Sequence, residues 1–192
     1  MTLPAPGADE VVIGVVVTVP VPHADVLAAA RLASGDPEAA TIAPHVTLVG
    51  PAVVARGALP EIDDHLAQVA AANGPFVVHL RGTGTFRPVS PVVFVALARG
   101  IADCEQLQRA VRRGPLNGPL RFPYHPHVTV AQGVDDTALD AAEKELGDYD
   151  GTFVVNAIDR YVNDDDGIWR PVRSFPLVGR AGHLTDVSGV SP

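Results

Sequence analysis

The sequence predicts a fold that mixes strands and helices and is built from two similar halves. Apolar runs rich in β-branched residues, such as Val11–Val19, indicate buried strands. Apolar residues at helical spacing, such as Ile62, Leu66 and Val69, indicate helices between the strands. The order strand, helix, strand, helix, strand occurs twice, and the tetrapeptide Pro-His-Val-Thr stands in both halves. An internal duplication is the simplest explanation.

The first half holds five predicted elements. They are a strand at 11–19, a helical stretch around 26–30, a strand at 45–49, a helix at 59–72 and a strand at 76–80. We expect Gly35 to end the first helical stretch and Asn73-Gly74 to end the second helix. Gly50-Pro51 is expected to stop the second strand, because proline cannot donate a hydrogen bond to a neighbouring strand.

The second half repeats this order after a connection, Gly-Thr-Gly-Thr-Phe-Arg-Pro, at 82–88. Its predicted elements are a strand at 91–97, a helix with an apolar stripe from 101 to 111 that ends at Gly114, a strand at 127–131, a helix from 135 or 136 to about 146, and strands at 153–162 and 169–178. Asp135 and Asp136 favour a helix start, since their carboxylates can accept hydrogen bonds from free backbone amides.

One two-lobed domain over 11–179 accounts for most of the 192 residues, with repeats at about 11–86 and 91–178 and flexible tails at 1–10 and 180–192. Lys and Arg number 14 against 22 Asp and Glu, so the formal charge is 14 − 22 = −8. That balance argues against a general basic surface for nucleic acid or anionic membranes, although a local anion site is compatible with it. The single cysteine, Cys104, excludes a disulfide framework and a cysteine-built zinc site.

The start of the chain lacks the basic segment of a signal peptide, and the apolar run 11–21 is shorter than the ~20 residues that cross a bilayer. We therefore expect a cytoplasmic protein with no membrane partner. A monomer is the expected oligomeric state, and the sequence points to no protein partner.

The repeated tetrapeptide carries the candidate chemistry. On a strand, residues i and i+2 share a face, so His45 and Thr47 project together, as do His127 and Thr129. If the two repeats face each other, two imidazoles and two hydroxyls converge on one cleft. Hydroxyls can hold the oxygens of a phosphate, while one imidazole accepts a proton and the other donates one. This chemistry needs no metal or cofactor. The alternative is structural, with each histidine hydrogen-bonded in a polar pocket.

These motifs resemble the paired signatures of the 2H phosphoesterases, and within them the bacterial group of 2′-5′ RNA ligases and RNA 2′,3′-cyclic phosphodiesterases. Residues 44–48 and 126–130 carry the resemblance, and the segments 82–86 and 169–177 are similar to other family segments. The resemblance covers roughly residues 11–179. It implies an α+β fold of two lobes, in which antiparallel sheets line a central cleft and helices lie outside.

The resemblance also implies metal-independent phosphodiester chemistry. It assigns His45 as the proton donor to the departing ribose oxygen and His127 as the proton acceptor that activates water, with a reversed pair as the alternative. Thr47 and Thr129 would hold the non-bridging phosphate oxygens.

Other residues are weaker candidates for substrate binding. Arg121 and Tyr124 precede the second motif, and Phe86 could contact a nucleobase, since aromatic rings stack on bases. Loop packing for Tyr124 and core packing for Phe86 are the structural alternatives. Arginines on one helix face could grip an RNA backbone or form a solvated surface; they are Arg109, Arg112 and Arg113. Arg87 and Trp169 could likewise contact a phosphate or base.

Three functions remain open at this point. The first is an enzyme that opens RNA 2′,3′-cyclic phosphate ends to a 2′-phosphate, with reverse 2′-5′ ligation as a side activity. The second is a phosphodiesterase on small cyclic nucleotides or ADP-ribose cyclic phosphate. The third is a binding module that captures phosphorylated RNA ends without turnover.

Overall fold

A computed structural model describes residues 5–120 and 122–179, so residues 1–4 and 180–192 of the two predicted tails lie outside it. The described chain has four α-helices. They are α1 (His23–Ala33), α2 (Leu59–Ala72), α3 (Ile101–Val111) and α4 (Asp136–Glu145). The strands follow in chain order. They are β1 (Glu10–Thr18), β2 (His45–Ala55), β3 (Phe76–Thr85), β4 (Val92–Arg99), β5 (His127–Gln132), β6 (Asp150–Val155), β7 (Ala157–Asn163) and β8 (Trp169–Pro176).

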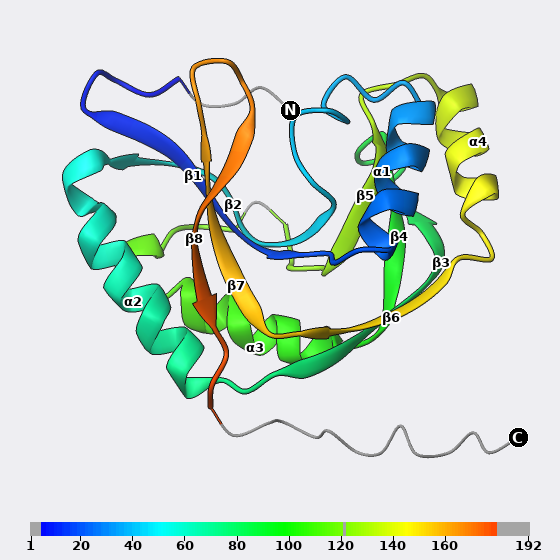
Figure 1. The fold of residues 1–192 in the computed structure, drawn as a ribbon. Coiled ribbons are helices and arrows are strands. Elements are labelled where there is room, and N and C mark those ends of the chain that lie inside the picture. The colour runs from blue at the N-terminus through cyan, green and yellow to red at the C-terminus, as the bar shows by residue number, and fades with distance from the viewer. Residues whose placement is uncertain (1–4, 121, 180–192) are drawn as a thin grey trace, which may run out of the picture.

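The strands form two antiparallel sheets of four strands each. The first sheet has the order β2-β1-β7-β8 and the second has the order β5-β4-β3-β6. Each sheet draws on both halves of the sequence, because β3 joins the second sheet while β7 and β8 return to the first (Figure 1). The α+β fold with two lobes and antiparallel sheets is therefore confirmed.

The helices also cross between the lobes. Helix α1 follows β1 of the first sheet but packs against β5 and α4 beside the second sheet. Helix α3 follows β4 of the second sheet but packs against β2 and α2 beside the first (Figure 1). This crossing places the edge strands β2 and β5 in contact with each other. The two halves thus interlock at the strands that carry the repeated tetrapeptide.

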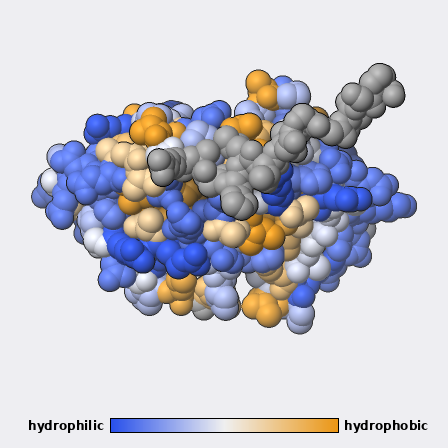
Figure 2. Space-filling view, turned by 90° about the horizontal axis from the view of Figure 1, so that it is seen from below, coloured by the Kyte–Doolittle hydropathy of each residue, from blue (hydrophilic) through white to orange (hydrophobic). Residues whose placement is uncertain are grey.

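The buried core follows the predicted apolar pattern. Strand β1 is buried from Val11 to Val17, as expected for a strand covered on both faces. The predicted stripe of α2 is buried at Ile62, Leu66 and Val69, and the bounds of α2 are those predicted. On the surface seen in Figure 2, apolar side chains form small groups separated by hydrophilic ones. Among the described residues, no helix combines the length and apolar character needed to cross a membrane.

Three predicted strand limits were wrong. Gly50-Pro51 does not stop the second strand, because β2 continues to Ala55. Between Ile13 and Val15 the register advances by three residues on β2, from Ala52 to Val49, so a bulge absorbs the extra residue. Proline is tolerated there because β2 is an edge strand, whose outer side needs no donor.

The other two differences lie in the second sheet and at its exit. Strand β3 runs on through Thr85, with a register shift beside Gly82, whose φ of +64° suits glycine. The predicted strand 153–162 is two strands, β6 and β7, separated at Asn156. The break is where the chain passes from the second sheet to the first.

A buried ion cluster fastens α2 to the first sheet. Asp63 on α2 accepts hydrogen bonds from Arg160 Nε at 2.6 Å and from Arg160 Nη2 at 3.0 Å. Arg173 Nη1 on β8 donates to the same carboxylate at 2.9 Å. Because Arg160 and Asp63 are both buried, each charge depends on the other for compensation.

We expect Asp63→Ala to lower the free energy of unfolding by about 3–5 kcal/mol, because it leaves the Arg160 guanidinium buried and unpaired. Urea denaturation measures the change. Asp64→Ala is the matched control, since the neighbouring Asp64 is exposed, and it should change stability by less than about 0.5 kcal/mol. Equal stability of the two variants would contradict the role given to the cluster.

Candidate active site

Strands β2 and β5 both begin at the histidine of the repeated tetrapeptide. Val46 and Leu48 are fully buried in β2, while His45 and Thr47, which alternate with them along the strand, are half-buried. Strand β5 repeats this alternation, with Val128 and Val130 buried and His127 and Thr129 half-buried. The predicted pairing of each histidine and threonine on one strand face is therefore present in both halves.

The two imidazoles are held by the same backbone contact. His45 Nδ1 lies 2.8 Å from the carbonyl oxygen of Ala43, and His127 Nδ1 lies 2.7 Å from that of His125. A carbonyl oxygen can only accept a hydrogen bond, so each Nδ1 carries the proton. In the neutral ring Nε2 then has a free lone pair. Both histidines are thus fixed in the tautomer that can accept a proton at Nε2.

Burial keeps both imidazoles neutral in the empty site. It lowers the pKa of His45 from 6.5 to about 4, against the opposing effect of the hydrogen bond to Ala43. The positive charge of Arg31, and that of His127 when its ring is protonated, lower the pKa of His45 further. Burial is also the main cause that lowers the pKa of His127. Strands β2 and β5 contact each other, and the charge of one ring acts on the pKa of the other.

The threonine hydroxyls of the motifs are available for a ligand. Neither Thr47 nor Thr129 makes a side-chain hydrogen bond to any other described residue, whereas Thr18, Thr83 and Thr85 do. An unpaired hydroxyl on a half-buried strand face can donate to an anionic oxygen. Each hydroxyl therefore suits a non-bridging oxygen of a phosphate, although only Thr47 of the two lines the cavity beside the second motif.

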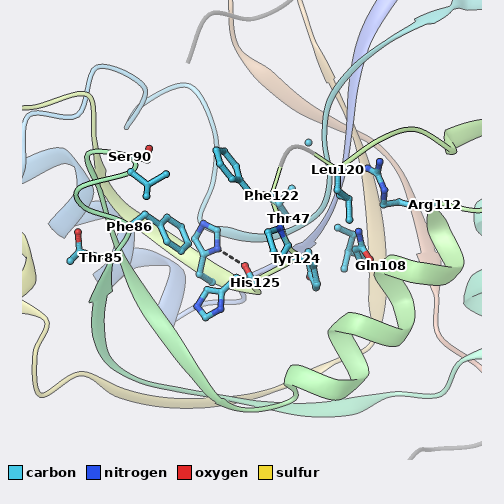
Figure 3. A pocket seen from close by; sticks show the side chains of 15 residues that line it. Thr47, Thr85, Phe86, Ser90, Gln108, Arg112, Leu120, Phe122, Tyr124 and His125 are labelled. Carbon is cyan, nitrogen blue, oxygen red and sulfur yellow. Dashed lines mark hydrogen bonds between the residues drawn. The ribbon is translucent and has the colours of Figure 1, made fainter.

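A cavity of about 690 Å³ opens beside the second motif. Its walls are mainly apolar and aromatic, and they include Thr47, Phe86, Phe122, Tyr124 and His127 (Figure 3). A volume of this size is typical of small-molecule sites, which lie roughly between 300 and 1,000 Å³. Thr47 comes from the first sheet and His127 from the second, so the cavity spans the contact between the lobes.

Aromatic rings surround His127. The ring of Phe86 meets it edge to face at 4.9 Å between centroids, and the ring of Phe94 lies at 5.1 Å. His125 stacks beside it at 6.1 Å. Gly84 makes room for this cluster, because a Cβ at that position would lie 2.8 Å from Phe94. These rings exclude water from His127, which explains why its neutral form is favoured.

The other predicted residues divide into two groups. Phe86, Tyr124 and Arg112 line the cavity, although Tyr124 also packs against the core, as its structural alternative expects. Arg121 lies outside the described residues, and Trp169 is not among the cavity's lining residues. Arg87 forms ion pairs with carboxylates of α4, which are Asp136, Asp140 and Glu143. That side chain therefore fastens α4 and is not free to hold a phosphate.

Gln108, which lines the cavity and is buried, was not predicted from the sequence. A signal for it was present. Gln108 stands four residues after Cys104 and three before Val111, so a polar side chain occupies the apolar stripe of α3. Among the described residues, no group of three or more His, Cys, Asp and Glu side chains could hold a metal ion.

Known proteins resemble this chain in sequence and in fold. Residues 19–167 match the family model described as the 2′-5′ RNA ligase superfamily. A candidate phosphoesterase of Bacillus cytotoxicus is 29% identical over 101 residues, which is 53% of this chain and 58% of that protein. The match thus spans little more than half the length of that relative.

Solved structures share the fold at low sequence identity. Escherichia coli LigT complexed with NADP⁺ superposes with a TM-score of 0.66 at 16% identity, covering 88% of this chain and 99% of LigT. The protein TT0787 of Thermus thermophilus gives a TM-score of 0.55 at 19% identity, with the same two coverages.

An NMR titration tests the state of the histidines. At neutral pH we expect both rings as Nδ1–H tautomers, with His45 taking up its proton near pH 4. Inorganic phosphate should raise both pKa values, because a bound anion favours the protonated ring. In the His127→Ala variant the pKa of His45 should rise, since a neighbouring positive charge is lost. A midpoint for His45 at or above 6.5 would contradict the assignment.

Proposed function

The chain belongs to the 2′-5′ RNA ligase superfamily, and on that premise we propose that it is a cyclic phosphodiesterase acting at RNA ends. It opens a 2′,3′-cyclic phosphate to a 2′-phosphate by two-histidine acid and base catalysis. The observation that supports this most strongly is the matched pair of imidazoles, each tied at Nδ1 and, among the described residues, unpaired at Nε2. The other bonded histidines differ: His23 uses both ring nitrogens, and His65 and His79 pair through Nε2.

The reaction follows from these groups. The neutral imidazole takes a proton from water at Nε2, and the water oxygen attacks phosphorus. The bond from phosphorus to O3′ breaks, and the second imidazole, protonated at Nε2, gives its proton to O3′. Thr47 and Thr129 donate to the non-bridging oxygens, whose charge grows in the transition state. After the reaction, the ring that was neutral is protonated and the ring that was protonated is neutral. The original protonation states return after the product leaves.

The division of roles follows from the two environments. The resemblance assigns proton donation to His45 and proton acceptance to His127. At a pKa of about 4 the neutral, proton-accepting form of His45 predominates at neutral pH, whereas the protonated form that a donor requires is scarce. We therefore propose the reverse: His45 activates water and His127, charged when the phosphate binds, protonates the leaving oxygen.

Known ligands of a structural neighbour support a nucleotide substrate. Escherichia coli LigT has been crystallised with NADP⁺, 3′-AMP, phosphate and ATP. Each carries phosphate, and three carry adenosine as well. The apolar and aromatic cavity beside His127 has the size for a nucleoside of this kind.

A basic hollow favours an RNA end over a small cyclic nucleotide. It adjoins the cavity, with which it shares Gln108, Arg112 and Leu120, and it is further lined by Arg109 and Arg113. Arg113 pairs with no carboxylate among the described residues. An RNA strand whose end lies in the cavity could place its upstream phosphates in the basic hollow. Small cyclic nucleotides or ADP-ribose cyclic phosphate remain the second candidate, which the overall charge of −8 favours.

The central test uses an oligonucleotide with a 2′,3′-cyclic phosphate end in EDTA. We expect opening to the 2′-phosphate by the wild type, and a loss of about 10²–10⁴-fold in kcat for His45→Ala and for His127→Ala. His79→Ala is the matched control, because that histidine pairs with Asp150 at the surface and should leave the rate unchanged.

Two outcomes would count against the proposed function. Absence of opening with tight binding of the cyclic end would favour a binding module, and activity that survives both alanine variants would exclude the histidine mechanism.

An aryl phosphodiester tests which histidine is the acid and which the base, since its leaving group needs no proton. His127→Ala should then retain more activity than His45→Ala, and the opposite order would restore the assignment implied by the resemblance.

Arg113→Glu separates the two substrate classes. We expect the ratio of kcat/KM for an oligonucleotide to that for a nucleoside 2′,3′-cyclic phosphate to fall by about fivefold at low salt. The fall should shrink as salt screens the charges. Lys144→Glu on α4 makes the same charge change outside the basic hollow and should leave the ratio unaltered. An unchanged ratio in Arg113→Glu would favour the small cyclic nucleotides.

A further inference from the structure

Two buried polar atoms that have no hydrogen-bond partner among the described residues belong to side chains in the wall of the same cavity. Nε2 of Gln108 is buried and has no hydrogen-bond partner among the described residues. The whole Gln108 residue is only 3% exposed, although it stands on the cavity side of α3. An unsatisfied buried amide opposes folding, so a residue of this kind calls for a separate explanation.

The hydroxyl of Tyr124 is the second such atom. It is buried and, among the described residues, unpaired, and Figure 3 draws it, like Gln108, on the α3 side of the cavity. Burial raises the pKa of this hydroxyl, with the nearby Cys104 and Glu105 of α3 as smaller causes. The group therefore keeps its proton and can donate a hydrogen bond as well as accept one.

The surroundings of these two atoms select the ligand chemistry. Phe86, Phe122 and Leu120 line the same cavity, so most of a bound molecule would face apolar groups. Arg112 also lines the cavity, but its Nη2 already donates to the carbonyl oxygens of Gly118 and Pro119. A charged phosphate at Gln108 or Tyr124 would therefore lose its hydration without an unengaged cation beside it. A purely aliphatic ligand would leave both polar atoms unpaired. A flat aromatic molecule with hydrogen-bonding atoms on one edge satisfies both conditions.

We propose that Gln108 and Tyr124 recognise the hydrogen-bonding edge of the nucleobase that carries the cyclic phosphate. This inference rests on the proposed function and adds a specificity site to it. The amide presents a donor and an acceptor side by side, which can pair with adjacent atoms of a base edge. The Tyr124 hydroxyl supplies a further contact. The base then lies in the cavity while its phosphate reaches His127 and Thr47, which line the same space.

The test compares a nucleoside 2′,3′-cyclic phosphate with 1-O-methylribose 2′,3′-cyclic phosphate, which lacks a base. In the wild type, kcat/KM for the nucleoside should exceed that for the abasic compound by at least about tenfold. Gln108→Leu and Tyr124→Phe should each reduce this ratio by about fivefold, mainly through KM. Gln106→Leu is the matched control on α3, because its side chain is exposed and bonds Asn73 outside the cavity.

A second measurement distinguishes recognition from a structural role. If Gln108 is kept for a ligand, the ligand-free Gln108→Leu variant should melt about 2–4 °C higher than the wild type, since an unpaired buried amide is removed. A structural hydrogen-bonding role predicts a lower melting temperature. The inference is overturned if the variant melts lower or if its preference for the nucleoside is unchanged.

The outcomes also separate this inference from the proposed function. If both compounds are opened at equal rates by the wild type, the base site is wrong and the phosphodiesterase stands. If neither compound is opened, the proposed function fails, and calorimetry with adenosine 2′-monophosphate decides the base site. Weaker binding to Gln108→Leu than to Gln106→Leu then supports it, and equal binding overturns it.

Discussion

The candidate site depends on the alternation of side chains along two edge strands. Val46 and Leu48 in β2, like Val128 and Val130 in β5, are buried because apolar surface is driven out of water. Their neighbours must then point to the other face, which is where the histidines and threonines lie. A slip of one residue in either strand would bury its imidazole and expose its valines. The hydrophobic core therefore holds the register of the candidate site, and the two Nδ1 contacts only set the orientation of the rings.

The electrostatics of the empty site follow from the same packing. The apolar rings around His127 and the burial of His45 disfavour positive charge on both imidazoles. In the proposed reaction a phosphodiester would bring the negative charge that the site lacks, and its binding would allow one ring to become protonated. The protein alone thus favours two neutral imidazoles, and a bound anion would supply the negative charge that stabilises a protonated ring.

Much of this could be predicted from the sequence, because it depends on local patterns. The bounds of α2 follow from uninterrupted helical spacing, whereas α3 ends at Val111, before the predicted stop at Gly114. The shared faces of His45 with Thr47 and of His127 with Thr129 follow from strand geometry. The bulge at Gly50-Pro51 could not be predicted, since it depends on the register against β1. The ion pairs of Arg87 and the exchange of strands between sheets join distant residues, and local patterns carry no information on them. Gln108 is visible in the sequence as a polar residue in the apolar stripe of α3, but only the structure shows that it lines the cavity.

The interlocking of the halves has a consequence for the origin of the fold. Neither half of the chain contains a complete sheet, since β3 lies in the second sheet and β7 and β8 lie in the first. An ancestor with a single repeat would have needed to swap strands and helices with an identical subunit to form the cleft. Such a homodimer would hold two equivalent imidazoles by symmetry. Gene fusion would make the exchange permanent and free each copy to diverge, so that one ring could acquire an aromatic enclosure and the other a neighbouring arginine.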